Sequence, residues 1–320
     1  MSSEVTSIEE KSNNSKNIIT YSAILITFLI ALWLSFQSEG PSKMPKVVTD
    51  EFTFTAWVND GEDYLKKNYR WFTKIIAGYI KNGYYFLEDF LIDSPWLLIA
   101  AIIFLPCLIA GGLRLGLYSL FVIYFWGGTG MWDESMQTLA LMGLSVLLCV
   151  VFGVTLGVMC SQSDRFDNFM KPILDTMQVM PAFVYLFPAL FFFGIGGAPA
   201  ILATMIYAMP PIIRLTNTGI RQVPEQTIES ATSFGSSKLQ LLFKIKIPLS
   251  LPSIMMGINQ VIMMALALVV LACFIGAEGI GGQVWLAIRN LDVGWAMEGG
   301  LCILFMAVSY THLRAHETFH

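Results

Sequence analysis

The chain has 320 residues, of which 55% are hydrophobic and only 13% are charged, and its formal net charge is −4. A soluble globular domain needs a polar surface, so this composition indicates a polytopic membrane protein instead. The negative charge and the absence of a basic cluster argue against a nucleic-acid partner. All five cysteines fall in apolar runs, which favours small buried side chains over disulfide or metal roles.

The first predicted element is a membrane anchor over residues 18–36, preceded by a cytoplasmic tail, residues 1–17. A cleaved signal peptide is the alternative, but no good small-residue cleavage site follows the apolar run, which favours a retained anchor. Residues 37–95 then carry aromatic side chains spaced among charged ones. This pattern is typical of amphipathic helices at the outer membrane interface, although the rings could also bind a ligand.

Most of the remaining chain consists of apolar runs long enough to cross a membrane. Residues 96–134 predict a close pair of spans divided at Arg114. Residues 135–310 form the core, with spans expected at residues 136–160, 177–193, 199–213 and 254–275 and a short final one at 299–310. Lysines and arginines fall mainly in loops that are cytoplasmic if the N-terminus is inside, as the positive-inside rule requires. The predicted fold is all-α, with about seven to eight transmembrane helices.

A polar segment, residues 214–252, separates two of these runs and is cytoplasmic in this topology. Pro224 is expected at the start of a short helix, where its missing N–H does no harm. Glu225 and Glu229 follow in the early turns, where they complement the helix dipole. Gly235 is expected to end this helix, because glycine readily adopts a positive φ.

A second short helix is expected to follow in the polar segment. Ser236 or Ser237 can cap it, and Pro248 and Pro252 are expected to end it and redirect the chain into the membrane. The small residues Ser230, Ala231, Thr232 and Ser233 in the first helix would let another surface approach closely, so the pattern predicts a docking element. The pattern alone leaves open an ordinary loop with two amphipathic helices.

The polar segment resembles the cytoplasmic signature of binding-protein-dependent ABC importer permeases, E-A-A, three residues, G, nine residues, I-x-L-P, at Glu229, Ser230, Ala231, Gly235, Ile245, Ile247 and Pro248. Two positions depart from that pattern, since Ser230 replaces an alanine and Ile247 a leucine. Other stretches between Pro95 and Leu304, such as "SDRFDNFMKPILDTMQVMP" and "PPIIRLTNTGIRQVP", are similar to permeases of glycine betaine/proline betaine importers.

The resemblance implies a type I ABC importer transmembrane fold in a homodimeric permease of the cell inner membrane. It also implies a separate cytoplasmic ATPase that holds ATP and Mg²⁺, an external (periplasmic) substrate-binding protein and surrounding membrane lipid. The polar segment, including Glu225, would then sit in a groove of the ATPase. The chain itself has no G-x-x-x-x-G-K-[ST] loop, so we expect neither enzyme activity nor a cofactor on it.

Polar side chains inside the apolar runs are the candidates for a translocation path, because such groups are costly in lipid. We expect Gln178, Thr204, Asn259 and Gln260 to line it, with Tyr185 offering its ring to a quaternary ammonium. The central runs carry no charge at mid-span, which suits a neutral or zwitterionic cargo. A secondary transporter would place coupling-ion carboxylates there. An amino-acid-type ABC importer stays open as the nearest alternative.

The last ten residues, 311–320, contain all three histidines, and His316, Glu317 and His320 spell the H-E-x-x-H pattern of zinc proteases. A catalytic zinc needs a third protein ligand and a folded pocket, and the sequence offers neither, so no metal site is predicted. The apolar run before these residues is short for a span, and we interpret the segment as a foreign tail.

Overall fold

The computed structural model describes residues 20–34 and 54–317, and the elements in these ranges are helical. The chain divides into two compact units, Met1–Lys67 and Asn68–His320. The first unit contains the apolar helix Thr20–Leu34, which covers the described part of the predicted anchor, and the beginning of α3 (Phe54–Asp93). The predicted tail, 1–17, and the start of the predicted external segment, 37–53, lie outside the described residues.

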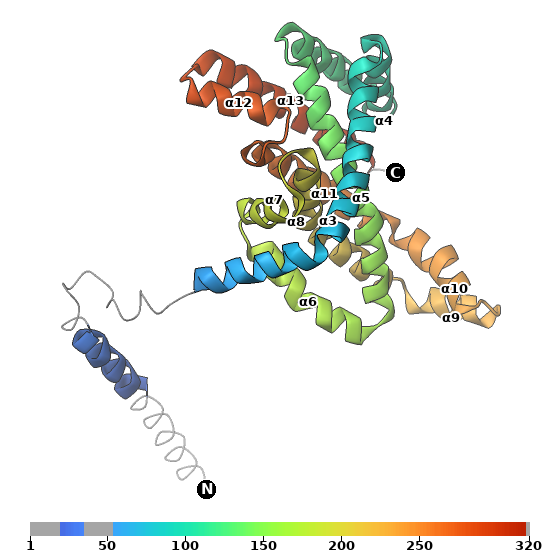
Figure 1. Cartoon of the computed structure of the whole chain (residues 1–320). Helices are drawn as coiled ribbons and strands as arrows, with labels where there is room; N and C mark the ends of the chain where they lie inside the picture. Colours follow the sequence, from blue (N-terminus) through green and yellow to red (C-terminus); the bar gives the residue numbers. More distant parts are fainter. Residues whose placement is uncertain (1–19, 35–53, 318–320) are drawn as a thin grey trace. The chain divides into compact units, whose positions relative to one another are not determined.

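The core of the second unit is helix α8 (Gly197–Arg221), which packs against both α5 (Trp132–Gln162) and α11 (Ile247–Leu271). Figure 1 shows these three helices together at the centre of the unit. In the described ranges, three single helical stretches are long and apolar enough to cross a membrane, and α5, α8 and α11 each lie in a different one of them. The span containing α8 is 72% buried, against 33% and 39% for the other two, so α8 is the central helix.

Glycines allow α8 to approach its neighbours closely. A Cβ atom added at Gly157 of α5 would lie 2.6 Å from Cβ of Thr216 and 2.8 Å from the carbonyl oxygen of Ile213, both on α8. A Cβ atom at Gly219 of α8 would lie 2.6 Å from Cβ of Ser253 on α11. Side chains do not fit at these distances, so small residues set the helix spacing, as they commonly do in membrane proteins.

Helix α4 (Trp96–Gly128) folds back on itself at Gly112, whose φ of 64° interrupts the helix. Gly116, after the break, lies against Phe104 and Leu108, before it, and a straight helix could not bring these residues together. The chain therefore reverses two residues before Arg114, the position at which the sequence predicts the division between two spans.

The predicted span 177–193 is not a single helix. Helix α6 (Asp164–Val179) ends before Pro181, and the 3₁₀ turn η1 (Ala182–Tyr185) with α7 (Leu186–Phe193) leaves it at 111°. The residue before a proline is driven out of the helical region, and Met180 is accordingly extended, with ψ of 132°. The proline therefore converts one predicted span into a bent pair.

The predicted redirection of the chain at Pro248 and Pro252 is wrong. Helix α10 (Lys238–Leu241), the π turn η2 (Leu242–Lys246) and α11 follow one another within one helical stretch, Lys238–Ile275. Pro248 lies in the first turn of α11, where a proline is well tolerated, and Pro252 lies inside the helix. The polar segment therefore leads into a membrane helix without a break.

The chain ends in helices α12 (Ile280–Arg289) and α13 (Val293–Glu317). The backbone of α13 continues through residues 311–317, so most of the segment interpreted as a foreign tail extends the final helix. Leucine, arginine, alanine and glutamate in this segment are good helix formers, which accounts for the continuation. Within the H-E-x-x-H pattern, His320 lies outside the described residues.

The second unit has two distinct ends. Helix α9 (Glu225–Ser233) and α10 project together at one end, and α12 lies at the other (Figure 1). At the α12 end, the start of α8 meets the end of the α11 stretch, because Gly196 N donates to the carbonyl oxygen of Ile275 at 3.0 Å. Helix α8 therefore runs from the α12 end toward the projecting helices, and α11 returns.

Candidate functional site

The polar segment, residues 214–252, supplies the two helices that project from the unit. Pro224 is the N-cap of α9, and Glu225 is its first residue, as the sequence predicts to within one position. After α9, Gly235 has a φ of 79°, the positive value that a glycine is expected to supply. Of the two serines that follow, Ser237 is the cap of α10. Its hydroxyl accepts from Gln240 N at 3.3 Å, and Gln240 Oε1 accepts from Ser237 N at 2.8 Å.

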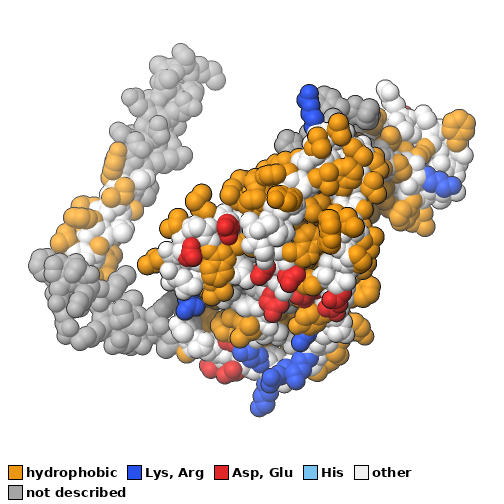
Figure 2. All heavy atoms as spheres, turned by 90° about the horizontal axis from the view of Figure 1, so that it is seen from above, with side chains coloured by type: hydrophobic (Ala, Val, Ile, Leu, Met, Phe, Trp, Pro, Cys, Tyr) orange, Lys and Arg blue, Asp and Glu red, His pale blue; other side chains and the backbone are white. Residues whose placement is uncertain are grey.

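The projecting helices carry large apolar side chains in the open. Phe234 is 92% exposed, Leu239 68% and Phe243 63%. Ile228, Ala231 and Phe234 recur at three-residue spacing along α9 and its C-cap, but of these three only Ala231 is buried. Hydrophobic side chains also appear on the surface of this projecting part in Figure 2. An exposed apolar cluster of this kind is typical of a surface that a partner protein covers.

Hydroxyl side chains of α9 fold back onto their own helix. The Ser230 hydroxyl donates to the carbonyl oxygen of Gln226 at 2.8 Å, and those of Thr232 and Ser233 donate to that of Glu229 at 2.8 and 2.9 Å. The exposed side chains at these positions are therefore short, and their hydroxyl groups already have hydrogen-bond acceptors within α9. Another surface can approach such a helix closely.

The remaining signature positions lie where the projection joins the membrane helix. Ile245 is in the π turn η2, Ile247 begins α11 and Pro248 follows it. Both isoleucines are partly buried, and Pro248 is exposed. π turns occur often at functional sites. The signature therefore comprises an exposed helix, a glycine turn and a widened turn at the foot of α11.

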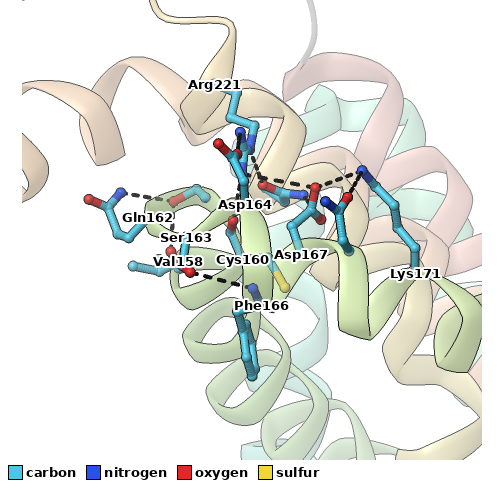
Figure 3. A network of polar contacts seen from close by, with 12 residues as sticks. Val158, Cys160, Gln162, Ser163, Asp164, Phe166, Asp167, Lys171 and Arg221 are labelled. Atoms are coloured by element: carbon cyan, nitrogen blue, oxygen red, sulfur yellow. Dashed lines mark hydrogen bonds and ion pairs between the residues drawn. The ribbon is translucent and has the colours of Figure 1, made fainter.

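On the other side of the projection, the end of α8 is held by a polar network, the Arg221 network (Figure 3). Arg221 is the last residue of α8. Its Nη1 donates to Asp164 Oδ1 of α6 at 2.6 Å, its Nη2 to the carbonyl oxygen of Cys160 of α5 at 2.8 Å, and its Nε to Asn217 Oδ1 at 2.9 Å. One guanidinium thus joins three helices.

Asp167 of α6 is the buried carboxylate of the same network. It accepts from Asn217 Nδ2 at 2.7 Å, pairs with Lys171 Nζ at 2.9 Å and lies 3.9 Å from Arg221 Nη2. These partners compensate the loss of water around a buried charge. A separate ion pair, Arg214 with Asp175, also joins α8 to α6.

The Arg221 network was not predicted from the sequence. The sequence pattern places the arginines of the polar segment only in a cytoplasmic loop. The sequence does contain a pattern, because Asp167 and Asp175 follow Asp164 by three and eleven residues, and these spacings place all three on one face of α6. Arg214 and Arg221 are seven residues apart, which likewise places them on one face of α8. The sequence does not show that these two faces meet.

The predicted path residues differ in their contacts and in their burial. The Tyr185 hydroxyl donates to the carbonyl oxygen of Met177, and its ring lies 5.6 Å from that of Tyr207 on α8. Thr204 is fully buried in α8, and its hydroxyl has no hydrogen-bond partner among the described residues. The other three differ in exposure: Asn259 is partly buried, and Gln178 and Gln260 are exposed.

At the opposite end of the unit, polar contacts join α3, α5 and the start of α12. The Gln137 amide donates to Glu88 Oε1 at 3.0 Å and to Glu278 Oε2 at 3.1 Å. Thr138 Oγ1 accepts from Ile280 N at 3.0 Å. Figure 2 shows acidic side chains near the centre of the face it views, with hydrophobic ones around them. Among the described residues, no group of three or more His, Cys, Asp or Glu is placed to hold a metal ion.

Comparison with known proteins defines the class to which this site belongs. Residues 150–313, about half of the chain, match the family of binding-protein-dependent transport system inner membrane components. The chain belongs to this family of transport permeases, and the resemblance stated from the sequence is confirmed. The described residues form helices, three of which are long and apolar enough to cross a membrane, and this architecture agrees with the membership. The match runs to residue 313, into the predicted foreign tail.

Individual relatives extend the comparison. The chain is 40% identical to the glycine betaine/proline betaine transport system permease protein ProW of Escherichia coli (strain K12), over 79% of this chain and 72% of that protein. It is 38% identical to the glycine betaine/carnitine transport permease protein GbuB of Listeria monocytogenes, over 83% and 94%. It is 48% identical to the glycine betaine transport system permease protein OpuAB of Bacillus subtilis, over 56% and 64%.

Among solved structures, an inward-facing MetNI methionine ABC transporter aligns with a TM-score of 0.48 and 19% identity, over 56% of this chain and 92% of that one.

Proposed function

We propose that this chain is the membrane-spanning permease subunit of an ATP-driven importer of glycine betaine, proline betaine and related quaternary ammonium solutes. The observation that carries this proposal is the projection formed by α9 and α10. The side chains of Phe234 and Leu239 are exposed on its surface, and α10 continues without a break into membrane helix α11. The solute class is supported by the names of relatives that are 38–48% identical to the chain.

A cytoplasmic ATPase is the partner that this projection fits. The ATPase would bind and hydrolyse ATP with Mg²⁺, because this chain has no phosphate-binding loop. Its groove would cover the exposed apolar side chains of α9 and α10, and Glu225, Glu229, Ser230 and Ala231 would lie in or beside it. Closure of the ATPase would displace the projection and, through Ile245, Ile247 and Pro248, the foot of α11.

The remaining partners follow from the same function. A second copy of the chain would complete the translocation path, an external binding protein would deliver the solute at the α12 end, and lipid would surround the apolar helices. The N-terminus would be cytoplasmic, in accord with the distribution of lysine and arginine. Multi-pass location in the inner membrane follows from the family itself.

The path residues belong to this proposal. The central helix α8 carries the buried Thr204, whose hydroxyl has no partner among the described residues and could serve a passing polar solute. The paired rings of Tyr185 and Tyr207 could face a trimethylammonium group. Gln178, Asn259 and Gln260 complete the proposed lining.

Transport by the reconstituted complex tests the proposal. The chain is inserted into proteoliposomes with its cognate ATPase, binding protein and enclosed ATP, and uptake of radiolabelled glycine betaine, proline betaine, choline and methionine is measured. We expect betaine uptake that stops when ATP is omitted or the ATPase is left out. Uptake that persists without ATP would indicate a secondary transporter, and uptake of methionine in place of the betaines would indicate an amino-acid importer. Either result contradicts the proposal.

A further inference from the structure

We propose that Arg221 is a positioning residue that transmits movement of the projecting helices to α6, as a second connection besides the direct one to α11. The inference rests on the proposed function, because it needs an ATPase that moves α9. It concerns a part of the chain outside the signature, whose positions begin at Glu229.

The connection between α9 and α8 is short and anchored. Only Gln222, Val223 and Pro224 separate the last residue of α8 from the first residue of α9. Val223 is buried, and so is Ile220 in the last turn of α8. A displacement of α9 therefore acts on the end of α8, since no slack chain lies between them.

Arg221 passes that displacement to two further helices. Its guanidinium donates to Asp164 at the start of α6 and to the carbonyl oxygen of Cys160 in the last turn of α5 (Figure 3). The planar guanidinium has five N–H donors in fixed directions, so it holds several acceptors at defined angles. An ammonium group on a lysine could not reproduce this set of bonds.

The ion pair between Arg221 and Asp164 is exposed to solvent, which distinguishes a positioning role from a contribution to folding stability. The Asp164 side chain is 82% exposed and that of Arg221 is 37% exposed. Ion pairs this accessible to water contribute little to folding stability. The contact between Arg221 and Asp164 is therefore better suited to fixing where α6 lies than to holding the unit together.

The far end of α6 leads toward the middle of the unit. Met177 lies in the last turn of α6, and its carbonyl oxygen accepts the hydroxyl of Tyr185 in η1. Because η1 and α7 leave α6 at 111° and follow it directly in the chain, a tilt of α6 displaces η1 and α7 as well. Tyr185 lies against Tyr207 of α8, so this displacement changes the contact between two aromatic rings inside the unit.

Uncoupling variants test the proposal. Arg221→Gln and Asp164→Asn are reconstituted with the ATPase and binding protein, and ATP hydrolysis and glycine betaine uptake are measured in the same vesicles. We expect hydrolysis to continue while the number of solutes moved per ATP falls by about fivefold or more, the lower end of typical coupling strengths. The double variant is expected to match Arg221→Gln alone, since Arg221→Gln already removes the ion pair that Asp164→Asn weakens.

Arg165→Gln is the matched control. It removes one charge from the residue after Asp164, and Arg165 is exposed. Its ratio of uptake to hydrolysis is expected to equal that of the unmodified chain. If Arg221→Gln fails to accumulate in the membrane, the test rests on Asp164→Asn alone. The Asp164 side chain is largely exposed, so we expect this variant to fold.

Two results would overturn the inference while leaving the proposed function standing. The first is an unchanged ratio in Asp164→Asn when the unmodified chain pumps normally. The second is an equal fall in hydrolysis and uptake, which would indicate a merely structural role. Absence of ATP-driven uptake by the unmodified chain would instead overturn the proposed function, and this inference with it.

Discussion

At the scale of single residues, Gly235 is a position where the backbone conformation restricts the choice of side chain. Its φ is 79°, and a Cβ atom added there would meet nothing within 4 Å. A substitution at this position therefore changes conformational preference and not packing. Alanine disfavours a positive φ by roughly 1–2 kcal/mol, and proline, whose ring fixes φ near −65°, cannot adopt it.

We expect Gly235→Pro to abolish betaine uptake, because the turn between α9 and α10 cannot form, and Gly235→Ala to lower it partially. Uptake is measured per molecule of permease in the membrane by quantitative immunoblotting. Gly300→Ala is the matched control, since Gly300 also has open space around its Cβ position but does not have a positive φ. Transport by Gly235→Pro at the normal rate would mean that the turn geometry has no part in coupling.

Residue features were predictable where they depend on neighbours in sequence. The glycine turn at Gly235 and the cap at Ser237 follow from local backbone rules, and both are present. The contact of Arg221 with Asp164 spans 57 positions and depends on which helix faces meet. A single sequence gives the charges on α6 and α8 but not the packing that joins them.

At the scale of helices, glycines set how closely α8 approaches its neighbours. Gly157 is the clearest case, because its added Cβ would lie within 2.8 Å of both Thr216 and the backbone of Ile213. The backbone oxygen cannot move aside as the end of a flexible side chain can. Helices α5 and α8 would therefore have to separate to admit even a methyl group.

Gly157→Ala is expected to destabilise the permease by about 1–3 kcal/mol, the usual range for overpacking a core. Gly143→Ala on the same helix has nothing within 4 Å of its added Cβ and is expected to leave stability unchanged or slightly higher. Thermal unfolding in detergent compares the two variants. Equal midpoints would show that α5 and α8 do not approach each other as closely as the structure indicates.

The helix predictions succeeded where hydrophobicity determines the position of a helix. They failed where a proline determines whether the helix bends or continues. The apolar runs correctly locate α5, α8 and α11. Pro181 lies inside an apolar run, so hydrophobicity hides the bend between α6 and α7. Pro248 was interpreted as a stop, but it lies in the first turn of α11, where proline is compatible with a helix. A proline therefore needs its helix position before its effect can be assigned.

At the scale of the molecule, the second unit is organised by two ends joined by three central helices. One end carries the exposed apolar side chains of α9 and α10, and the other carries the contacts of Gln137 with Glu88 and Glu278. Composition predicted the membrane class, and the distribution of lysine and arginine leads us to expect the polar segment on the cytoplasmic side. They could not predict the acidic contacts at the far end, because these join α3, α5 and the residues before α12, which lie far apart in sequence.

The central claim is that the partner ATPase binds the projecting helices. Photo-cross-linking at Phe234 tests this claim most directly. A benzophenone amino acid replaces Phe234, which is 92% exposed, and in a second strain it replaces Leu291, which is 86% exposed near the α12 end. On illumination of intact cells, we predict an adduct between permease and ATPase from position 234 and none from position 291. No ATPase adduct at position 234, or equal adducts at both, would contradict the account.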